Sequence, residues 1–264
     1  MTNYYDKENN RLVFIKQKAN PAFWDKHWNK NSFKNQYNLK SNFVVRYTQK
    51  FLPRGWRILE GGCGLGQNVY KLHKSGYNCI GIDYASQTVK LIKNTFPELD
   101  IRLGDVRNLK FKNDYFDGYW SLGVIEHFYK GYEKILDEMS RVVEKKGYVF
   151  VTFPHMSLLR RVKARLALYP EWIEKKKNIK CFYQFALDEK EVIKNFEKQG
   201  FKIVEEHYLD GYGGASRELL LFKYLFKNLS ERKNSLARIL MILIDFFMSR
   251  FCSHIILLVF VNKK

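Results

Sequence analysis

Short apolar runs alternate with amphipathic segments in the middle of the chain, between about residues 55 and 155. Five runs predict strands, at residues 57–60, 78–83, 101–105, 116–122 and 147–153. The segments between them have the three-to-four-residue spacing of helices that bury one face, at residues 68–74, 86–94 and 132–143. Strands that alternate with helices predict crossover connections, and therefore a parallel sheet with helices on both faces.

The same alternation continues in the second half of the chain. Asp188 and Glu191 form a D-x-x-E capping box at the start of a helix, and Gly200 ends that helix. Two more apolar runs, at residues 201–206 and 254–261, bring the expected strands to seven. The sequence therefore predicts an α/β fold with a Rossmann-like, doubly wound, mostly parallel seven-stranded sheet.

Three segments fall outside this alternation. Residues 1–54 are expected to form an N-terminal helical lid segment, in which Trp24 and Trp28 share one helix face. These tryptophans either stack over a ligand that the domain binds or anchor the segment to the core. The remaining domain, residues 55–264, is expected to carry helical insertions at about residues 156–182 and 215–250.

The chain is strongly basic, with a formal net charge of +19. Residues 1–54 carry a net charge of +8 and residues 156–264 one of +9, whereas residues 55–155 are close to neutral. Such a field attracts nucleic acid, an anionic membrane surface or a phosphorylated substrate. A general enrichment in Lys and Asn that favours solubility explains the same charge equally well.

The four cysteines favour a reduced, cytoplasmic setting. They lie at positions 63, 79, 181 and 252 and form no C-x-x-C pair, so neither a zinc site nor a disulfide framework is expected. The first residues contain no apolar stretch of signal-peptide length. We therefore expect a cytoplasmic protein without a metal, with association to a membrane as an open alternative.

A glycine-rich loop follows the first strand of the alternating region. Glu60, Gly62, Gly64 and Gly66 form the pattern E-x-G-x-G-x-G directly before a helix. Glycine permits positive φ angles and close approach of the backbone to a ligand. A dinucleotide loop reads G-x-G-x-x-G and binds a diphosphate, whereas the acid here would repel a diphosphate and attract an ammonium group. The loop predicts a cationic nucleoside ligand without phosphate.

In this loop the chain resembles the class I S-adenosylmethionine-dependent methyltransferases, and more narrowly the type 11 and quinone-biosynthesis-like enzymes among them. The resemblance covers residues 55–155 closely and residues 183–214 loosely. It implies methyltransferase activity with S-adenosylmethionine as the cofactor. Glu60 would serve the methionine end, Asp83 the ribose hydroxyls and Asp105 the adenine amino group. The implied cofactor contacts are Glu60, Gly62, Cys63, Gly64, Gly66, Asp83, Tyr84, Asp105, Val106, Ser121 and Leu122.

Two histidines are candidates for a catalytic base. Methyl transfer from a sulfonium is an in-line displacement that depends on positioning, with removal of a proton when the acceptor is a hydroxyl. His127 follows the fourth strand and His155 the fifth, so both loops are expected to open toward one crevice. A structural role is the alternative for each of them.

The acceptor is expected to be a small molecule, a sugar or a lipid-linked glycan. Enzymes that methylate the exocyclic amines of bases carry N/D-P-P-Y/F after the fourth strand, where this chain has Ser121-Leu122-Gly123-Val124. Two alternatives stay open. One is an RNA methyltransferase that holds phosphates with the basic flanks, and the other is a non-catalytic, cofactor-binding partner subunit.

The two insertions raise the question of a membrane. Residues 157–180 combine leucines with eight basic side chains, a pattern typical of an amphipathic helix on an anionic membrane surface. Four of these cations are Arg160, Arg161, Lys163 and Arg165. Residues 215–249 are more apolar, but Asp245 and Arg250 interrupt the run before it could span a bilayer. The alternative is that both insertions cap the site or form a homodimer face.

Overall fold

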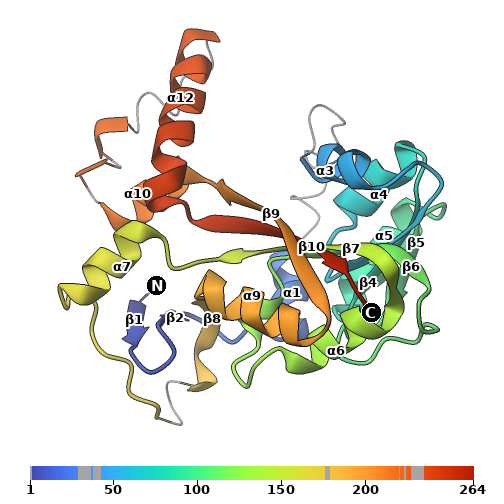
Figure 1. Cartoon of the computed structure of the whole chain (residues 1–264), viewed down its shortest axis with the longest axis horizontal. Coiled ribbons are helices and arrows are strands. Elements are labelled where there is room, and N and C mark those ends of the chain that lie inside the picture. The colour runs from blue at the N-terminus through green and yellow to red at the C-terminus, as the bar shows by residue number, and fades with distance from the viewer. Residues whose placement is uncertain are drawn as a thin grey trace.

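A seven-stranded sheet runs through the computed structural model, which describes residues 2–28, 37, 43–175, 179–219, 221–222, 224–226 and 235–264. The strand order is β5-β4-β3-β6-β7-β10-β9 (Figure 1). Their bounds are β3 (Arg57–Gly61), β4 (Asn78–Asp83), β5 (Asp100–Leu103), β6 (Phe116–Leu122), β7 (Val143–Pro154), β9 (Phe201–Leu209) and β10 (Ile255–Asn262). The first five strands in this order are parallel, and β10 is antiparallel to both of its neighbours. The predicted doubly wound, mostly parallel sheet is confirmed.

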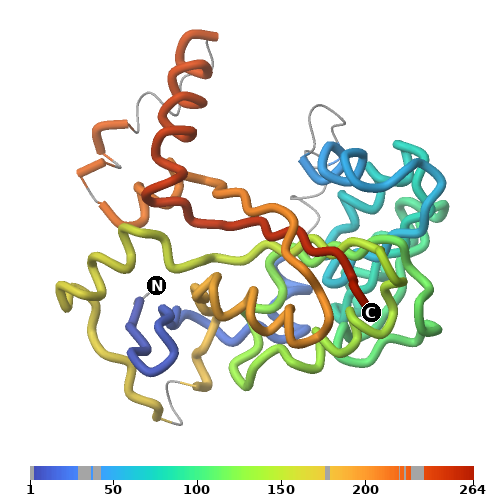
Figure 2. The backbone as a smooth tube through the Cα atoms, in the orientation of Figure 1, coloured from blue at the N-terminus to red at the C-terminus, as the bar shows by residue number. Residues whose placement is uncertain are grey.

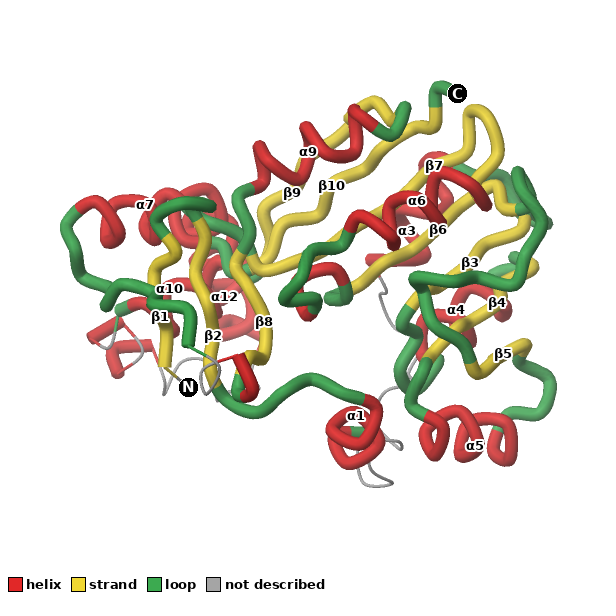
Figure 3. Tube along the Cα trace, turned by 90° about the horizontal axis from the view of Figure 1, so that it is seen from below, coloured by secondary structure: helices red, strands yellow, loops and turns green. Residues whose placement is uncertain are grey.

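Helices cover both faces of this sheet because successive side chains of a strand point to opposite sides. Leu59 and Tyr119 belong to the apolar cluster that also contains residues of α6 (Glu133–Val142) and α9 (Glu189–Lys198), and Figure 3 shows these two helices lying over the strands. Their neighbours Ile58 and Trp120 face the other layer. That layer consists of α3 (Phe43–Phe51), α4 (Gln67–Lys74) and α5 (Ser86–Thr95). Two apolar clusters therefore hold the sheet between two layers of helices.

The N-terminal segment differs from the helical lid that the sequence predicted. It begins with a hairpin of β1 (Thr2–Asp6) and β2 (Arg11–Ile15), which pairs with β8 (Phe182–Ala186) in a separate three-stranded sheet (Figure 3). Leu12 and Phe14 pack on Met156, whereas Val13 joins the main core on the opposite face. Because β2 is buried on both faces, its short apolar run lacks the alternation that identifies a strand. Helix α1 (Pro21–His27) follows.

The first insertion is helical only in part, whereas the described residues of the second are helical except for Leu219. The first contains α7 (Leu158–Arg165), after which the chain continues without a helix to residue 175. The second contains α10 (Gly211–Glu218) and α12 (Ser235–Cys252). In Figures 1 and 2, α12 stands off the body of the molecule. In the described part of the chain, we find no helix that combines the length and the apolar character needed to cross a membrane.

Three of the four cations that were expected on a membrane-facing side of α7 are engaged with the protein itself. Arg160 is 1% exposed and donates from Nε to Glu218 at 2.9 Å. Lys163 donates from Nζ to the same carboxylate at 2.7 Å, and Arg161 pairs with Asp188 at the start of α9. A buried charge needs such a partner because its desolvation is costly. The prediction that these three cations face outward is wrong.

Candidate functional site

A pocket with an empty volume of about 600 Å³ lies at the carboxyl edge of the central sheet. Loops after β3, β4, β5 and β6 form its walls, and α1 lies against it. The lining residues are Trp24, Trp28, Gly62, Asp83, Tyr84, Gly104, Asp105, Val106, Leu122, Gly123, Val124, His127 and Phe128.

The glycine-rich loop after β3 depends on its lack of side chains. Gly62, Gly64 and Gly66 have φ angles of 76°, 50° and 69°, in the region that favours glycine. A Cβ atom at Gly62 would lie 2.6 Å from the side chain of Val124, and one at Gly64 would lie 2.9 Å from Trp28. The loop backbone therefore lies directly against these side chains, and Gly62 itself lines the pocket.

Five residues that the sequence assigned to the cofactor do not themselves line the pocket: Glu60, Cys63, Gly64, Gly66 and Ser121. Cys63 is buried in the core, where its N–H donates to the carbonyl of Ile82 at 3.0 Å. Gly66 is the N-cap of α4, and a Cβ atom there would lie 3.2 Å from Ile101. Any contact of Cys63 or Gly66 with a ligand would therefore come from the backbone.

Four of the expected contacts form one wall: Asp83, Tyr84, Asp105 and Val106. The carboxylate of Asp83 accepts from the N–H groups of Gly64 at 2.8 Å and Ala85 at 2.9 Å. Burial raises the pKa of Asp83. Hydrogen bonds from Arg107, at 2.5 to 3.2 Å, lower the pKa of Asp105. A carboxylate offers about four lone-pair positions, so Asp83 retains capacity for ligand hydroxyl groups. Asp105 accepts four contacts from Arg107, and one of them must give way before it accepts from a ligand amino group.

Three buried oxygen atoms near the glycine loop have no hydrogen-bond partner among the described residues: Glu60 Oε2, Ser121 Oγ and Glu126 Oε2. Glu60 Oε1 accepts from Asn68 at 2.8 Å, and Gly61 pairs with Ser121 across β3 and β6. Burial raises the pKa of Glu60 to about 8. An unsatisfied buried carboxyl group is costly, and a cationic amino group beside it would remove that cost. These oxygen acceptors therefore fit the ammonium end of the ligand that the sequence predicts.

His127 lines the pocket at the end of a short 3-10 helix, η1 (Ile125–His127). Its Nδ1 lies 2.7 Å from the carbonyl oxygen of Tyr183. Because a carbonyl only accepts, Nδ1 carries the proton and Nε2 keeps a lone pair. Burial lowers the pKa of His127 to about 4, so the ring is neutral at pH 7. The ring also packs edge-on against Trp24 at 5.1 Å. His127 is thus a fixed proton acceptor at the pocket wall.

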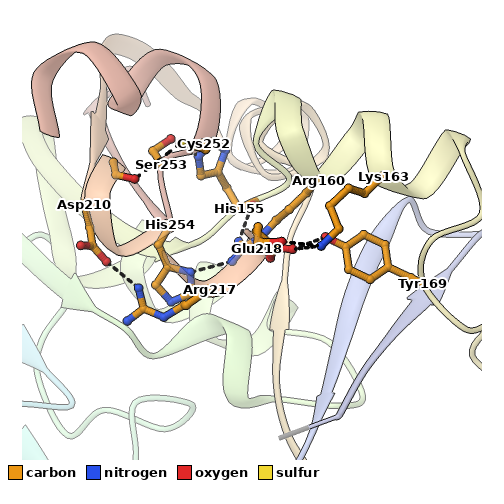
Figure 4. A network of polar contacts seen from close by, with 11 residues as sticks. His155, Arg160, Lys163, Tyr169, Asp210, Arg217, Glu218, Cys252, Ser253 and His254 are labelled. Atoms are coloured by element: carbon orange, nitrogen blue, oxygen red, sulfur yellow. Dashed lines mark hydrogen bonds and ion pairs between the residues drawn. The ribbon is translucent and has the colours of Figure 1, made fainter. Parts of the chain in front are cut away.

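His155 lies outside the pocket. It is 2% exposed, and its Nε2 is 2.7 Å from the hydroxyl of Ser253. Burial lowers its pKa. Beyond β7 the chain turns toward β8, where His155 forms a bridge with Leu187, and it joins the polar network of Figure 4. The expectation that His127 and His155 share one crevice is therefore wrong.

Helix α1 closes the pocket from the N-terminal side. Trp24 and Trp28 stack with their ring centroids 6.2 Å apart, and no residue of α1 is buried. Asp25 Oδ1 accepts from the N–H of Thr88 at 2.9 Å. It thereby caps α5, whose own N-cap residue, Ala85, has no side-chain acceptor. The tryptophans line the site and are not anchors in the core, which decides between the two alternatives.

Sequence reasoning did not identify several residues of the site. Gly104, Gly123, Val124 and Phe128 line the pocket, and Glu126 is buried directly beside His127. Burial raises the pKa of Glu126 to about 8. An acid between Ile125 and His127 reads locally as a surface residue, since Glu is almost never fully buried. The signal that could have indicated Glu126 is its position shortly after β6, a strand that ends at the edge of the sheet where the pocket lies.

Comparisons with known proteins agree with this site. A family model described as a methyltransferase domain matches residues 59–151. A probable S-adenosylmethionine-dependent methyltransferase from Mycolicibacterium smegmatis is 30% identical over 101 residues, which are 38% of this chain and 39% of that protein. A probable tRNA methyltransferase 9B from Homo sapiens is 32% identical over 110 residues, which are 41% of this chain and 23% of that protein. The chain thus spans about two fifths of the length of the Mycolicibacterium protein and about a quarter of that of the human protein.

Solved structures share the fold over most of the chain. A putative methyltransferase in complex with the Haloferax volcanii Trm112 methyltransferase activator aligns with a TM-score of 0.59 at 13% identity, covering 94% of this chain and 99% of that one. A TehB-like S-adenosylmethionine-dependent methyltransferase from Corynebacterium glutamicum aligns with a TM-score of 0.55 at 18% identity, covering 93% and 100%. The glycine loop, the acids at the ends of β3 and β4 and the family match coincide in one place. This chain therefore contains a class I S-adenosylmethionine-dependent methyltransferase domain, with S-adenosylmethionine as the cofactor of that domain.

Proposed function

We propose that the protein transfers a methyl group from S-adenosylmethionine to a hydroxyl of a small molecule, a sugar or a lipid-linked glycan. The observation that carries the proposal is the position of His127, a neutral proton acceptor of fixed tautomer, in the wall of the cofactor pocket. When bound, S-adenosylmethionine would supply a methyl group activated by a sulfonium: its carbon–sulfur bond breaks, with the electron pair left on sulfur, as the acceptor oxygen bonds to the methyl carbon in line. The protein contributes orientation, exclusion of water and removal of one proton.

The acids at the pocket and beneath the glycine loop, and the tryptophans of α1, each have a task in this proposal. Glu60 holds the ammonium group of the methionine end, because its Oε2 lacks another partner in the described chain. Asp83 binds the ribose hydroxyls, and Asp105 accepts from the adenine amino group. Trp24 and Trp28 cover the loop and exclude water, which strengthens these polar contacts in the closed site.

His127 takes the proton of the acceptor hydroxyl through Nε2. Its Nδ1–H stays bonded to the Tyr183 carbonyl, so the ring does not rotate away from the pocket. The residues before it, Leu122-Gly123-Val124, differ from the tetrapeptide of enzymes that methylate exocyclic amines of bases. An acceptor hydroxyl therefore suits this wall better than a base amine.

A second candidate function is methylation of RNA. Two observations favour it: relatives named probable tRNA methyltransferase 9B match 41% of this chain, and the flanks of the domain are basic. Incubation of the protein with methyl-labelled S-adenosylmethionine and separated lipid, small-molecule and RNA fractions tests both. Label in the lipid or small-molecule fraction supports the first proposal, and label in RNA alone replaces it with the second.

Replacement of His127 by Asn should lower the turnover number by about 10²- to 10⁴-fold, the usual contribution of a general base. The affinity for S-adenosylmethionine, measured by calorimetry, should change by less than about threefold, because the cofactor contacts remain. The exposed His73 on α4, changed to Asn, is the matched control and should have wild-type turnover. Equal turnover of the His127 variant and the wild type would remove the histidine from the mechanism.

Cofactor binding should depend on pH through Glu60. The pKa of its buried carboxyl group is raised to about 8, so the empty site is mostly protonated at pH 7. A bound ammonium group favours the carboxylate and lowers that pKa, so binding releases a proton and affinity rises with pH. We expect up to about tenfold tighter binding per unit between pH 6 and 7.5.

Calorimetry in buffers of different ionisation enthalpy measures this released proton directly. Glu60→Gln should bind S-adenosylmethionine more weakly and with little dependence on pH over the same range. A flat profile for the wild type would show that the Glu60 carboxyl group does not change its protonation on binding.

A further inference from the structure

Helix α12 exposes a continuous apolar face. Its members recur at the three- and four-residue spacing of one side of a helix, and each is between 47% and 71% exposed. This α12 apolar face consists of Leu236, Ile239, Ile242, Leu243, Phe246 and Phe247. Figures 1 and 2 show α12 projecting from the body of the molecule. A contiguous apolar surface of this kind on a projecting element indicates an interaction site.

Contacts with α10 determine which side of α12 faces outward. A Cβ atom at Gly211 would lie 2.4 Å from the backbone nitrogen of Ser249, so the two helices pack backbone to backbone. Asp245 Oδ1 accepts from the N–H of Tyr212 at 2.9 Å, at the start of α10. Small and polar residues of α12 therefore contact α10, while its large apolar residues stay exposed. Ile242, Phe246 and Phe247 line an open hollow between α12 and β9. This arrangement is the reverse of that of a surface helix in a monomeric globular protein.

Charge selects a lipid surface as the occupant. The exposed charged residues of α12 are Arg238 and Arg250, both basic, because Asp245 is engaged at α10. The whole chain carries +19, so a second copy of it would be repelled. An anionic lipid surface, in contrast, attracts the cations and accepts the apolar side chains. An 18-residue helix is about 27 Å long, shorter than the roughly 30 Å of a hydrocarbon core, and its three charges also oppose spanning.

We propose that the α12 apolar face, with Arg238 and Arg250, binds the interface of an anionic membrane. The proposal replaces the earlier expectation for α7, because Arg160, Arg161 and Lys163 are paired within the protein. It does not depend on the chemistry proposed for the pocket. Helix α12 contributes no residue to the cofactor pocket, so binding to lipid and binding of the cofactor are separable.

Sedimentation of the full chain with vesicles tests the proposal. We expect binding to vesicles of phosphatidylcholine with about one third phosphatidylglycerol to be at least tenfold stronger than to phosphatidylcholine alone. High salt should weaken it, because exposed charges are screened within about 10 Å at 0.1 M. The double variant Phe246→Ser with Phe247→Ser should reduce binding at least tenfold. The control Val204→Ser, an exposed apolar residue on β9, should bind like the wild type.

Cofactor affinity and melting temperature of the double variant should match the wild type, which excludes misfolding as the cause of lost binding. Equal sedimentation of wild type and double variant, or none by the wild type, overturns the proposal. A concentration-dependent dimer in sedimentation velocity that the double variant abolishes, without vesicle binding, would assign the face to a second copy of the chain instead.

Discussion

Replacement of Gly64 by Val should weaken binding of S-adenosylmethionine by at least about 100-fold. The residue has a φ angle of 50°, which a β-branched side chain adopts only with strain of about 1–3 kcal/mol. A Cβ atom there would also lie 2.9 Å from Trp28, so the added methyl groups would displace the lid tryptophan and occupy the approach to the loop. Titration calorimetry with the cofactor measures the loss.

Gly55→Val provides a matched control for the strain itself. Gly55 has a φ angle of 85°, and nothing lies within 4 Å of a Cβ atom built on it. Both variants should therefore have lower melting temperatures, but the Gly55 variant should keep wild-type affinity for the cofactor. Unchanged affinity of the Gly64 variant would contradict the assigned role of the loop, and an equal loss in both would trace the effect to general destabilisation.

Replacement of Arg160 by Met should lower the free energy of unfolding by about 3–5 kcal/mol, the usual result of removing one partner of a buried ion pair. The side chains of Arg160 and Glu218 are each 1% exposed, and the guanidinium also donates to the carbonyl of His155 at 2.8 Å and bonds His254 Nδ1 at 2.8 Å (Figure 4). Without Arg160, the carbonyl of His155 and His254 Nδ1 lose this donor, and the carboxylate of Glu218 loses its buried cation. Urea-induced unfolding measures the difference.

The exposed pair of Arg217 and Asp210 is the control for this experiment. Its side chains are 50% and 39% exposed, so Arg217→Met should cost less than about 1 kcal/mol. The double variant Arg160→Met with Glu218→Leu should be more stable than Arg160→Met alone, because it removes a buried carboxylate that has lost its buried cation and keeps only Lys163 and Tyr169 as donors. A loss below 1 kcal/mol for Arg160→Met would show that the network does not stabilise the fold.

The same network predicts a dependence of stability on pH. Burial alone would raise the pKa of Glu218, but the charge of Arg160 and hydrogen bonds from Lys163 and Tyr169 lower it overall. A carboxyl group with a lowered pKa stabilises the fold above its unfolded pKa and loses that contribution as the pH falls through its folded pKa. The wild type should therefore lose stability on acidification through Glu218. Arg160→Met should lose less, because the pKa of Glu218 is lowered less without the charge of Arg160.

The central sheet and the cofactor loop could be predicted because local patterns determine them. Each strand from β3 to β7 is a short apolar run between turns, and alternation of strands with helices leaves essentially one handedness for the crossovers. Glu60, Gly62 and Asp83 lie at strand ends, so the topology alone brings them to one edge. No long-range contact needs to be known for that inference.

Other features depend on partners far away along the chain. The periodicity of α7 shows an amphipathic helix, but Arg160 is buried because Glu218, 58 residues later, supplies the opposite charge. His155 lies away from His127 because the small sheet of β1, β2 and β8 draws the chain after β7 toward it. The outward side of α12 follows from backbone contact at Gly211. A sequence pattern determines which faces an element has, whereas the partner that each face meets is decided only when distant segments pack together.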